Sequence, residues 1–418
     1  MRTIRSVMVL FFLLFLFLDA SAASNPARSV STPKEDWHPH INRREAVPEE
    51  LKIFVLDVGQ GDAIFIEFPH GETMLIDAGS WDGYGIPHLS HFLENYFQVN
   101  SFKKKTIDMI VVSHPDFDHI SGLKEIIDGY WVNWFIDSGR AGSRKTYSEL
   151  MTDVKFKDEE NRFDYIAITE KADGFKKDGF FKLDDILDFE DCDCFLLSSY
   201  RGKGWQDPNN ASISVKIKCG RSSALFMGDA EGKNKLDEDK YIKVDLNSWS
   251  ENRIYKRLKG LEHQKLLDSD LIKTGHHGTD KAASELFLKA VSPKVSVIST
   301  GDYRISEKAK KYGHPRAAHL QRLEKYTSGT SAGKRRIRAF ETHAKKVTLE
   351  ITKDIFLTGP EHELKKNYSP GASGTQSIKE YGDILLILRD GVVRKVSKDD
   401  PEYMKYFPVQ SILKYSDD

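Results

Sequence analysis

Four side chains that can bind a metal ion fall within six consecutive residues of this 418-residue chain. They are His114, Asp116, Asp118 and His119. Imidazole and carboxylate groups together suit Zn²⁺, Mn²⁺ or an iron ion. The alternative interpretation is a polar turn between a strand and a helix, in which an aspartate caps the helix and the histidines bind nothing.

The segments on either side place this cluster on a loop. The apolar run Met109–Val112 leads into it and predicts a buried strand, and Ile120–Ile127 follows with the apolar spacing of a helix. Loops that leave a buried strand are where α/β proteins usually carry their chemistry. The spacing therefore favours a functional loop over an incidental turn.

Other chemically interesting residues also follow apolar runs. Asp229 comes after the predicted strand Ala224–Met227 and one glycine, so its carboxylate is well placed to enter a cleft. His276 and His277 lie between two glycines after the run Ser269–Lys273. We favour a site role for the paired histidines, with a solvated loop as the alternative.

Two aspartates lie near the start of the folded part. A turn with two glycines ends at Asp62, directly before the predicted strand Ala63–Phe68, which indicates either a positive-φ backbone near a site or an ordinary β-turn. Asp77 follows the predicted strand Met74–Ile76. We expect Asp77 to be structural or to support a metal ligand rather than to bind the metal itself.

The overall charge gives no sign of a nucleic-acid partner. The chain has 62 lysine and arginine residues against 63 aspartate and glutamate residues, so such a partner would need a local basic patch. The densest basic run is Lys334–Arg338. A solvated strand is its default interpretation, and a contact with phosphate groups is the alternative.

The chain begins with the pattern of a secretory signal peptide. Two arginines precede the apolar run Val7–Leu18, and Ala20–Ala22 supplies a small-residue cleavage site. The run is short for a transmembrane helix, which needs about 20 apolar residues, although an uncleaved anchor is the alternative. We expect export to the periplasm or the exterior, and no membrane span in the mature chain.

Composition divides the remaining chain into a few parts. The predicted parts are a signal peptide (1–23), a linker (24–50), one domain (51–358) with charged surface insertions at about 141–185 and 232–264, and a C-terminal appendage (359–418). Val347–Ile351 is predicted to close the sheet of the domain. Asp383–Val396 is predicted to be a hairpin with a turn at Asp390 and Gly391.

The three cysteines are too few for a disulfide scaffold, even in an oxidising compartment. Cys192 and Cys194 are too close in sequence for an easy bridge. A metal site built from them would lack a third soft ligand nearby.

Seven short motifs occur in one order along the chain. They are Asp57–Ala63, Leu75–Gly79, Ser113–His119, Asn209–Ser212, Gly228-Asp229, His276–Thr279 and Tyr312–Pro315. With this order the chain resembles the metallo-β-lactamase-fold hydrolases, and more narrowly the hydrolase domain of ComEC-type DNA-uptake proteins. The resemblance covers about residues 51–326 and implies an α/β fold, a four-layer αββα sandwich, with a site for two divalent metal ions, Zn²⁺ or Mn²⁺.

The resemblance also implies a role for each matching residue. His114 and Asp116 would bind the first metal, Asp118 and His119 the second, and Asp229 would bridge the two. The remaining candidate metal ligands are His276 and His314, the candidate catalytic residues are Asp118 and His277, and the candidate residues behind the ligands are Asp62, Asp77 and Asn210. Either paired histidine fits as the ligand, and the other would then face the substrate.

Two departures from the superfamily pattern bear on the metal. Asp116 replaces a histidine of the superfamily motif, and a carboxylate at that position makes Mn²⁺ a rival to Zn²⁺. The histidine expected between the first cluster and Asp229 is missing, and Asn209 and Asn210 stand near that point. With one imidazole fewer, the first metal is expected to bind more weakly.

The implied reaction is hydrolysis by a metal-bound hydroxide that attacks phosphorus or a carbonyl carbon. A phosphodiester, nucleic acid included, is the favoured substrate on the strength of the resemblance. One alternative is an ester, lactone or thioester hydrolase with an apolar pocket. The other is a non-catalytic metal-binding module that kept the fold.

Overall fold

The structure is a computed structural model that describes residues 43–44, 50–139, 145–169, 173–198, 208–232, 249–301, 311–358 and 382–408. The predicted signal peptide lies outside the described residues, as does most of the predicted linker. No helix in the described ranges is long and apolar enough to cross a membrane.

The first of two large sheets has eight strands in the order β17-β16-β1-β2-β3-β4-β5-β6. Its strands are β1 (Leu51–Val55), β2 (Ala63–Glu67), β3 (Thr73–Ala78), β4 (Thr106–Val111), β5 (Trp131–Asp137), β6 (Asp164–Ala167), β16 (Ile384–Arg389) and β17 (Val392–Lys395). The neighbours from β3 to β6 are parallel, and the other pairs are antiparallel.

The second sheet has seven strands in the order β15-β12-β11-β10-β9-β8-β7. Its strands are β7 (Phe181–Lys182), β8 (Cys192–Ser198), β9 (Ser214–Cys219), β10 (Ser222–Phe226), β11 (Leu271–Lys273), β12 (Val295–Ile298) and β15 (Ile355–Leu357). The neighbours β10, β11, β12 and β15 are parallel.

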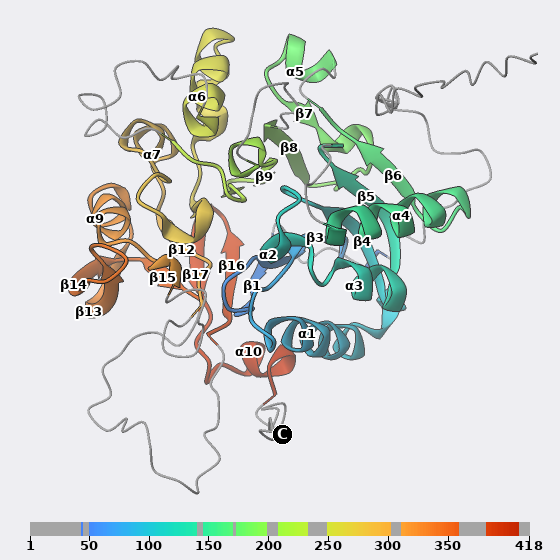
Figure 1. Ribbon diagram of the computed structural model, residues 1–418, viewed down its shortest axis with the longest axis horizontal. Helices are drawn as coiled ribbons and strands as arrows, with labels where there is room; N and C mark the ends of the chain where they lie inside the picture. The colour runs from blue at the N-terminus through green and yellow to red at the C-terminus, as the bar shows by residue number, and fades with distance from the viewer. Residues whose placement is uncertain are drawn as a thin grey trace, which may run out of the picture.

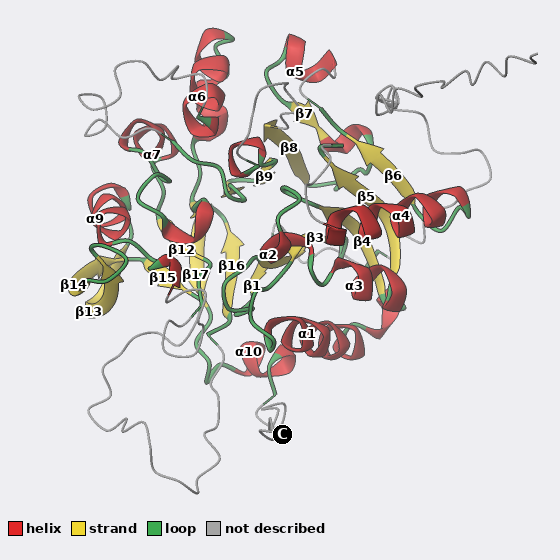
Figure 2. Ribbon diagram, in the orientation of Figure 1, coloured by secondary structure: helices red, strands yellow, loops and turns green. Residues whose placement is uncertain are grey.

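Helices cover the outer face of each sheet (Figures 1 and 2). The first sheet is covered by α1 (Gly85–Val99), α3 (Leu123–Gly129), α4 (Lys145–Glu159) and α10 (Pro401–Tyr406), and the second by α6 (Ser250–Gly260), α7 (Glu285–Val291) and α9 (Ala317–Tyr326). Shorter helical segments are α2 (Phe117–Ile120), α5 (Asp173–Lys177), η1 (Ser101–Lys103), η2 (Leu183–Asp185), η3 (Asn209–Ala211), η6 (Gln264–Leu267) and η7 (His276–Gly278). The predicted four-layer αββα sandwich is confirmed.

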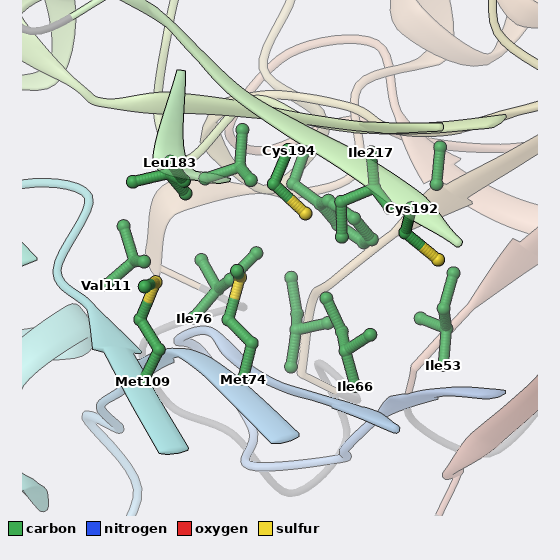
Figure 3. Packing of buried hydrophobic residues seen from close by; sticks show 14 of the residues in the cluster. Ile53, Ile66, Met74, Ile76, Met109, Val111, Leu183, Cys192, Cys194 and Ile217 are labelled. Atoms are coloured by element: carbon green, nitrogen blue, oxygen red, sulfur yellow. The ribbon is translucent and has the colours of Figure 1, made fainter. Parts of the chain in front are cut away.

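The two sheets pack face to face through alternate residues of their strands. Figure 3 shows Met74, Met109 and Val111 of the first sheet facing Leu183 of η2 and Ile217 of β9, on the side of the second sheet. The residues between them on the same strands point the opposite way, into the helix layers. Since both faces of the central strands are buried, their sequences are almost continuously apolar.

The C-terminal residues 382–408 belong to the first sheet and are not a separate appendage. Strand β16 pairs antiparallel with β1, with Leu388 opposite Leu51. The Asp383 carboxylate accepts hydrogen bonds from the Asp57 backbone N–H (2.8 Å) and from His88 Nε2 (2.8 Å). The boundary expected at residue 359 is therefore wrong for this part, although the hairpin predicted around Asp390 is confirmed.

The two predicted insertions also contribute to the layers. Residues 141–185 supply strand β6 to an edge of the first sheet and β7 to an edge of the second. Helix α6, within the second predicted insertion, buries Ile254 and Leu258 against the second sheet. These segments therefore add more than surface loops, because short apolar stretches such as the one around Ile254 and Leu258 lie among their charged residues.

The strand predicted to close the sheet forms a separate ribbon instead. Val347–Ile351 lies within β14 (Lys346–Lys353), which pairs only with β13 (Thr330–Phe340) among the described strands. The edge of the second sheet is formed by β15. In the basic run, Lys334 and Arg336 face Glu350, so a solvated strand is the better interpretation of this segment.

Cys192 and Cys219 form a disulfide across the neighbouring strands β8 and β9. Cys194, the nearer neighbour of Cys192 in sequence, is free and buried between the sheets. The pairing depends on the register of two strands, which the spacing of the cysteines does not reveal.

The hairpin β16–β17 offers a matched test of the C-terminal contribution. Leu386 is fully buried between the sheets, whereas Val392 on the partner strand is 62% exposed. Leu386→Ala should lower the free energy of unfolding by about 2–5 kcal/mol, because it opens a cavity in the core. Val392→Ala should change it by less than about 0.5 kcal/mol. Equal effects of the two variants in chemical denaturation would contradict the assignment of β16 to the core.

Lys216 predicts a pH dependence of stability. Its ammonium group is buried beneath the second sheet, donates to Asp268 O and to Ser269 Oγ, and burial lowers its pKa from 10.5 to about 7. Between pH 7 and 10 the unfolded chain therefore holds a proton that the folded chain does not, so this residue's contribution makes stability rise with pH. Denaturation of wild type and Lys216→Met at both pH values should show that rise in wild type alone, and parallel profiles would refute it.

Candidate metal centre

The chemically interesting loops leave the carboxyl ends of parallel strands in both sheets. From the first sheet come the loops after β3 and β4, and from the second come those after β10, β11 and β12. Because parallel strands deliver their following loops to the same edge, residues far apart in sequence meet there. Four histidines reach this edge around the buried carboxylate of Asp229.

His119 is fixed from behind by Asp77. Asp77 has a left-handed backbone (φ 58°), which turns its carboxylate towards the loop after β4. It accepts hydrogen bonds from the Ser113 backbone N–H (2.7 Å) and hydroxyl (2.6 Å), and from His119 Nδ1 (2.8 Å). This leaves His119 Nε2 directed at Asp229 Oδ1, 3.3 Å away.

His277 is fixed in a similar way by a backbone carbonyl. Its Nδ1 donates to Ser299 O at 3.0 Å, in the segment directly after β12. Its Nε2 then lies 3.4 Å from Asp118 Oδ2 and 3.6 Å from Asp229 Oδ2. His277, Asp118 and His119 therefore surround one side of the Asp229 carboxylate.

His114 lies beside His119, with ring centroids 4.1 Å apart, and close to Asp116. Its Nδ1 is 3.0 Å from Ser113 Oγ and 3.4 Å from Ser212 Oγ. Its Nε2 is 3.7 Å from Asp116 Oδ2 and 3.9 Å from Asp229 Oδ2.

His276 approaches the same carboxylate from the turn after β11. Its Nδ1 is 2.7 Å from Glu231 Oε1, and its Nε2 is 3.8 Å from Asp229 Oδ2. His276 and His277 both have left-handed backbones (φ 45° and 50°), an arrangement that costs energy for non-glycine residues. The neighbouring Gly275 is required because a Cβ there would lie 2.0 Å from Ala230 O. The backbone of this turn is thus held in an unfavourable conformation that presents both imidazoles to Asp229.

The pKa values of these groups reflect the crowding of opposite charges. Burial alone would raise the pKa of Asp229, but His277, His119 and His276 hold it well below its usual range. Burial lowers the pKa of His119, but Asp229 and Asp77 raise it well above the usual value. For His276 the same balance, with Asp229 and Glu231 outweighing burial, raises the pKa to about 9.

The donor atoms of this cluster fit a divalent metal. Four buried atoms facing one another, His114 Nε2, His119 Nε2, His277 Nε2 and Asp229 Oδ1, have no hydrogen-bond partner among the described residues. Ligands about 2.1 Å from a tetrahedral metal lie about 3.4 Å apart, close to the separations found here. Each Nδ1 is held by a carboxylate, carbonyl or hydroxyl, which is the usual arrangement of metal-binding histidines. The site can therefore hold divalent metal.

The structure places the other predicted residues around this centre. His314 packs beside the paired histidines, with ring centroids 5.8 Å from His276 and 6.4 Å from His277, but it does not join a group of converging ligand atoms. Asp62 forms a buried ion pair with Lys273. Asn210 lies behind the site, with its Nδ2 3.4 Å from Glu231 Oε2.

Several residues that support the site were not predicted as site residues. Glu231 and Ser299 hold histidines through contacts across the fold, Ser212 lies within the motif Asn209–Ser212 but had no assigned role, and Lys273 looked like an interior strand residue. A charged lysine at the end of a buried apolar strand was the one available hint, because such a residue needs a buried partner.

The sequence model of the metallo-beta-lactamase superfamily matches residues 56–302, more than half of the chain. The chain belongs to the metallo-beta-lactamase superfamily. Its members are generally metal-dependent hydrolases, so the fold and the enzyme class expected from the sequence are both confirmed.

Curated relatives of this metallo-beta-lactamase superfamily chain include Competence protein ComA of Neisseria gonorrhoeae, which is 26% identical over 67% of this chain and 31% of its own length. ComE operon protein 3 of Bacillus subtilis is 24% identical over 66% of this chain and 31% of its own length. Recombination protein 2 of Haemophilus influenzae is 26% identical over 66% of this chain and 27% of its own. The chain thus spans less than a third of these relatives. Among solved structures, the metallo-beta-lactamase fold protein YhfI of Bacillus subtilis aligns with 67% of this chain and 94% of its own, at 10% identity and a TM-score of 0.35.

The support that Asp77 gives to His119 can be tested by metal affinity. The asparagine of Asp77→Asn tolerates the left-handed backbone, but its amide NH₂ group, itself a donor, then faces the hydrogen-bond donors that the carboxylate accepted. It should weaken metal binding by about 10–100-fold, measured by competition with a chelator, as expected for loss of a carboxylate behind a metal-binding histidine. Asp108→Asn removes an equally buried carboxylate, paired with Lys103 away from the centre, and should leave the affinity unchanged. Equal losses in both variants would mean that Asp77 acts only through stability.

Proposed function

We propose that this protein is an exported phosphodiesterase that works with two divalent metal ions. The observation that carries the proposal is the convergence of buried ligand atoms near Asp229, with His114, His119 and Asp229 in one group and Asp118, His119 and His277 in another. His114, Asp116 and His276 would hold the first metal, and Asp118, His119 and His277 the second. Asp116 adds oxygen to the first group, which makes Mn²⁺ as suitable as Zn²⁺ there.

The roles of the histidines follow from where their nitrogens point. With its Nδ1 bound to Ser299 O and its Nε2 between Asp118 and Asp229, His277 is better suited to bind metal than to transfer a proton. We therefore replace the catalytic role expected for His277 by a ligand role, and treat Asp118 in the same way. His314 stacks beside His276 and His277, and its Nδ1 is buried without a hydrogen-bond partner among the described residues, so we keep it as a candidate metal ligand.

The proposed hydrolysis uses both the metals and the protein's own groups. Divalent metals bound here would lower the pKa of a water molecule and stabilise the negative charge that develops on the substrate. Asp77, Ser299 and Glu231 hold the imidazoles in the tautomer that leaves Nε2 available. The buried Lys273 balances part of the negative charge of the carboxylates by pairing with Asp62.

Two further observations support the substrate class and the compartment. The curated relatives are named as competence and recombination proteins, which favours a nucleic-acid phosphodiester over an acyl ester. The disulfide between Cys192 and Cys219 is typical of proteins in oxidising compartments and agrees with the signal peptide proposed at residues 1–23.

Turnover and metal content measured on the same samples test the proposal. Protein purified without a chelator should contain about two metal ions per chain and hydrolyse bis-p-nitrophenyl phosphate faster than p-nitrophenyl acetate. His119→Ala and Asp229→Ala remove ligands, and each should lose more activity than the about 10–100-fold typical of residues behind a ligand. His263→Ala, at an exposed position away from the centre, is the matched control. Faster hydrolysis of the acyl ester would indicate an acyl hydrolase instead of a phosphodiesterase. Bound metal without any turnover would indicate a non-catalytic binding module.

A further inference from the structure

The four imidazoles around Asp229 differ in how firmly burial fixes them. The side chains of His114, His119 and His277 are at most 1% exposed, whereas that of His276 is 25% exposed. Packing therefore determines the orientation of the first three rings. The ring of His276 has room to turn towards solvent, so its orientation depends on hydrogen bonding.

The partner of His276 is itself held on several sides. Glu231 is buried, and its Oε1 lies 2.7 Å from His276 Nδ1. Its Oε2 lies 3.4 Å from the Asn210 Nδ2 donor, and its backbone carbonyl accepts the Glu251 N–H at 3.0 Å. Asn210 in turn is fixed by Ser250, whose hydroxyl donates to the Asn210 carbonyl at 2.5 Å. The carboxylate of Glu231 therefore has one well-defined position, with one oxygen directed at His276.

The position of His276 also explains the missing histidine of the superfamily pattern. Its Nε2 is 3.8 Å from Asp229 Oδ2 and 3.5 Å from Asn209 Nδ2, the residue near the point where that histidine was expected. An imidazole from the turn after β11 thus occupies the neighbourhood that lacks one. Its orientation relies on Glu231, from the loop after β10.

We propose that Glu231 is the positioning residue that turns His276 into a ligand of the first metal, in place of the missing superfamily histidine. The inference rests on the proposed two-metal site and concerns the affinity of its first metal. A carboxylate that accepts the Nδ1 proton orients the ring and makes Nε2 a stronger ligand. Without it, His276 would sample other rotamers, and the first metal would lose a nitrogen ligand while the second kept all of its own.

Metal titrations of Glu231 variants test this directly. Glu231→Ala should lower the affinity for the more weakly bound metal by about 10–100-fold and leave the affinity for the other metal unchanged. Glu231→Gln keeps a neutral acceptor within reach of His276 Nδ1, so its first-metal affinity should fall less than that of Glu231→Ala. It can also replace the alanine variant in the test if that variant folds poorly. In Co²⁺-loaded protein, Glu231→Ala should change the visible absorption of one ion only. A loss shared equally by both metals, or equal losses in the two variants, would indicate a merely structural role.

A double-mutant comparison separates action through His276 from every other route. In a His276→Ala background, Glu231→Ala should cause no further change in first-metal affinity. Lys281→Met is the matched control: its ammonium is 3.9 Å from Glu231 Oε2, and its removal leaves the contact with His276 in place. It should change first-metal affinity by less than about threefold. A further loss in the double variant, or a comparable loss in the control, would overturn the inference.

The result can be read independently of turnover. One outcome is that the wild-type protein binds two metals and the Glu231 variants show the expected affinity losses, without any hydrolysis of bis-p-nitrophenyl phosphate. That result would contradict the proposed phosphodiesterase and support the role of Glu231. Wild-type protein that binds only one metal, with unchanged affinity in Glu231→Ala, would refute the inference itself.

Discussion

The central constraint on this structure is the excess of negative charge buried around Asp229. Asp62, Asp77, Asp118 and Asp229 are all buried at one edge of the sheets, and Lys273 is the buried lysine that pairs with this group. A carboxylate at such depth is very unfavourable unless positive charge lies nearby. His119 and His276, whose pKa values are raised, supply part of that charge, and divalent ions bound at the centre would supply more. The fold and the geometry of the candidate ligands are therefore both constrained by the need to compensate this buried negative charge.

The fold brings the buried carboxylates and the histidines together on loops from both sheets. Asp77 and the cluster His114–His119 come from the first sheet, whereas Asp229 and the paired histidines come from the second. The core between the sheets, shown in Figure 3, fixes the distance between the two sets of loops. A change in that packing would alter the distance between candidate ligands such as His119 and His277 without a substitution at either residue.

The local part of this arrangement was predictable from sequence, and the long-range part was not. The cluster from His114 to His119 is contiguous, and Asp229 and the paired histidines each follow an apolar run, so residue types and spacing indicated them. Glu231 and Ser299 act through contacts with residues 45 and 22 positions away, which no local pattern encodes. The same reason explains the misplaced boundary at residue 359, because β16 owes its place to pairing with β1. His314 was chosen from a motif alone, and the stacking that places it beside the ligands depends on tertiary structure.

The pairing of β1 with β16 has a consequence for the order in which the chain can fold. Leu51 and Leu388 lie opposite each other, so the strand that begins the first sheet must wait for one of the last described segments before its open edge is covered. Contacts at such sequence separation form late, because closing a long loop costs entropy before any contact repays it. While residues 384–389 are still being synthesised, β1 presents an unpaired and strongly apolar edge. This exposed edge makes the incomplete chain dependent on protection from aggregation during that interval.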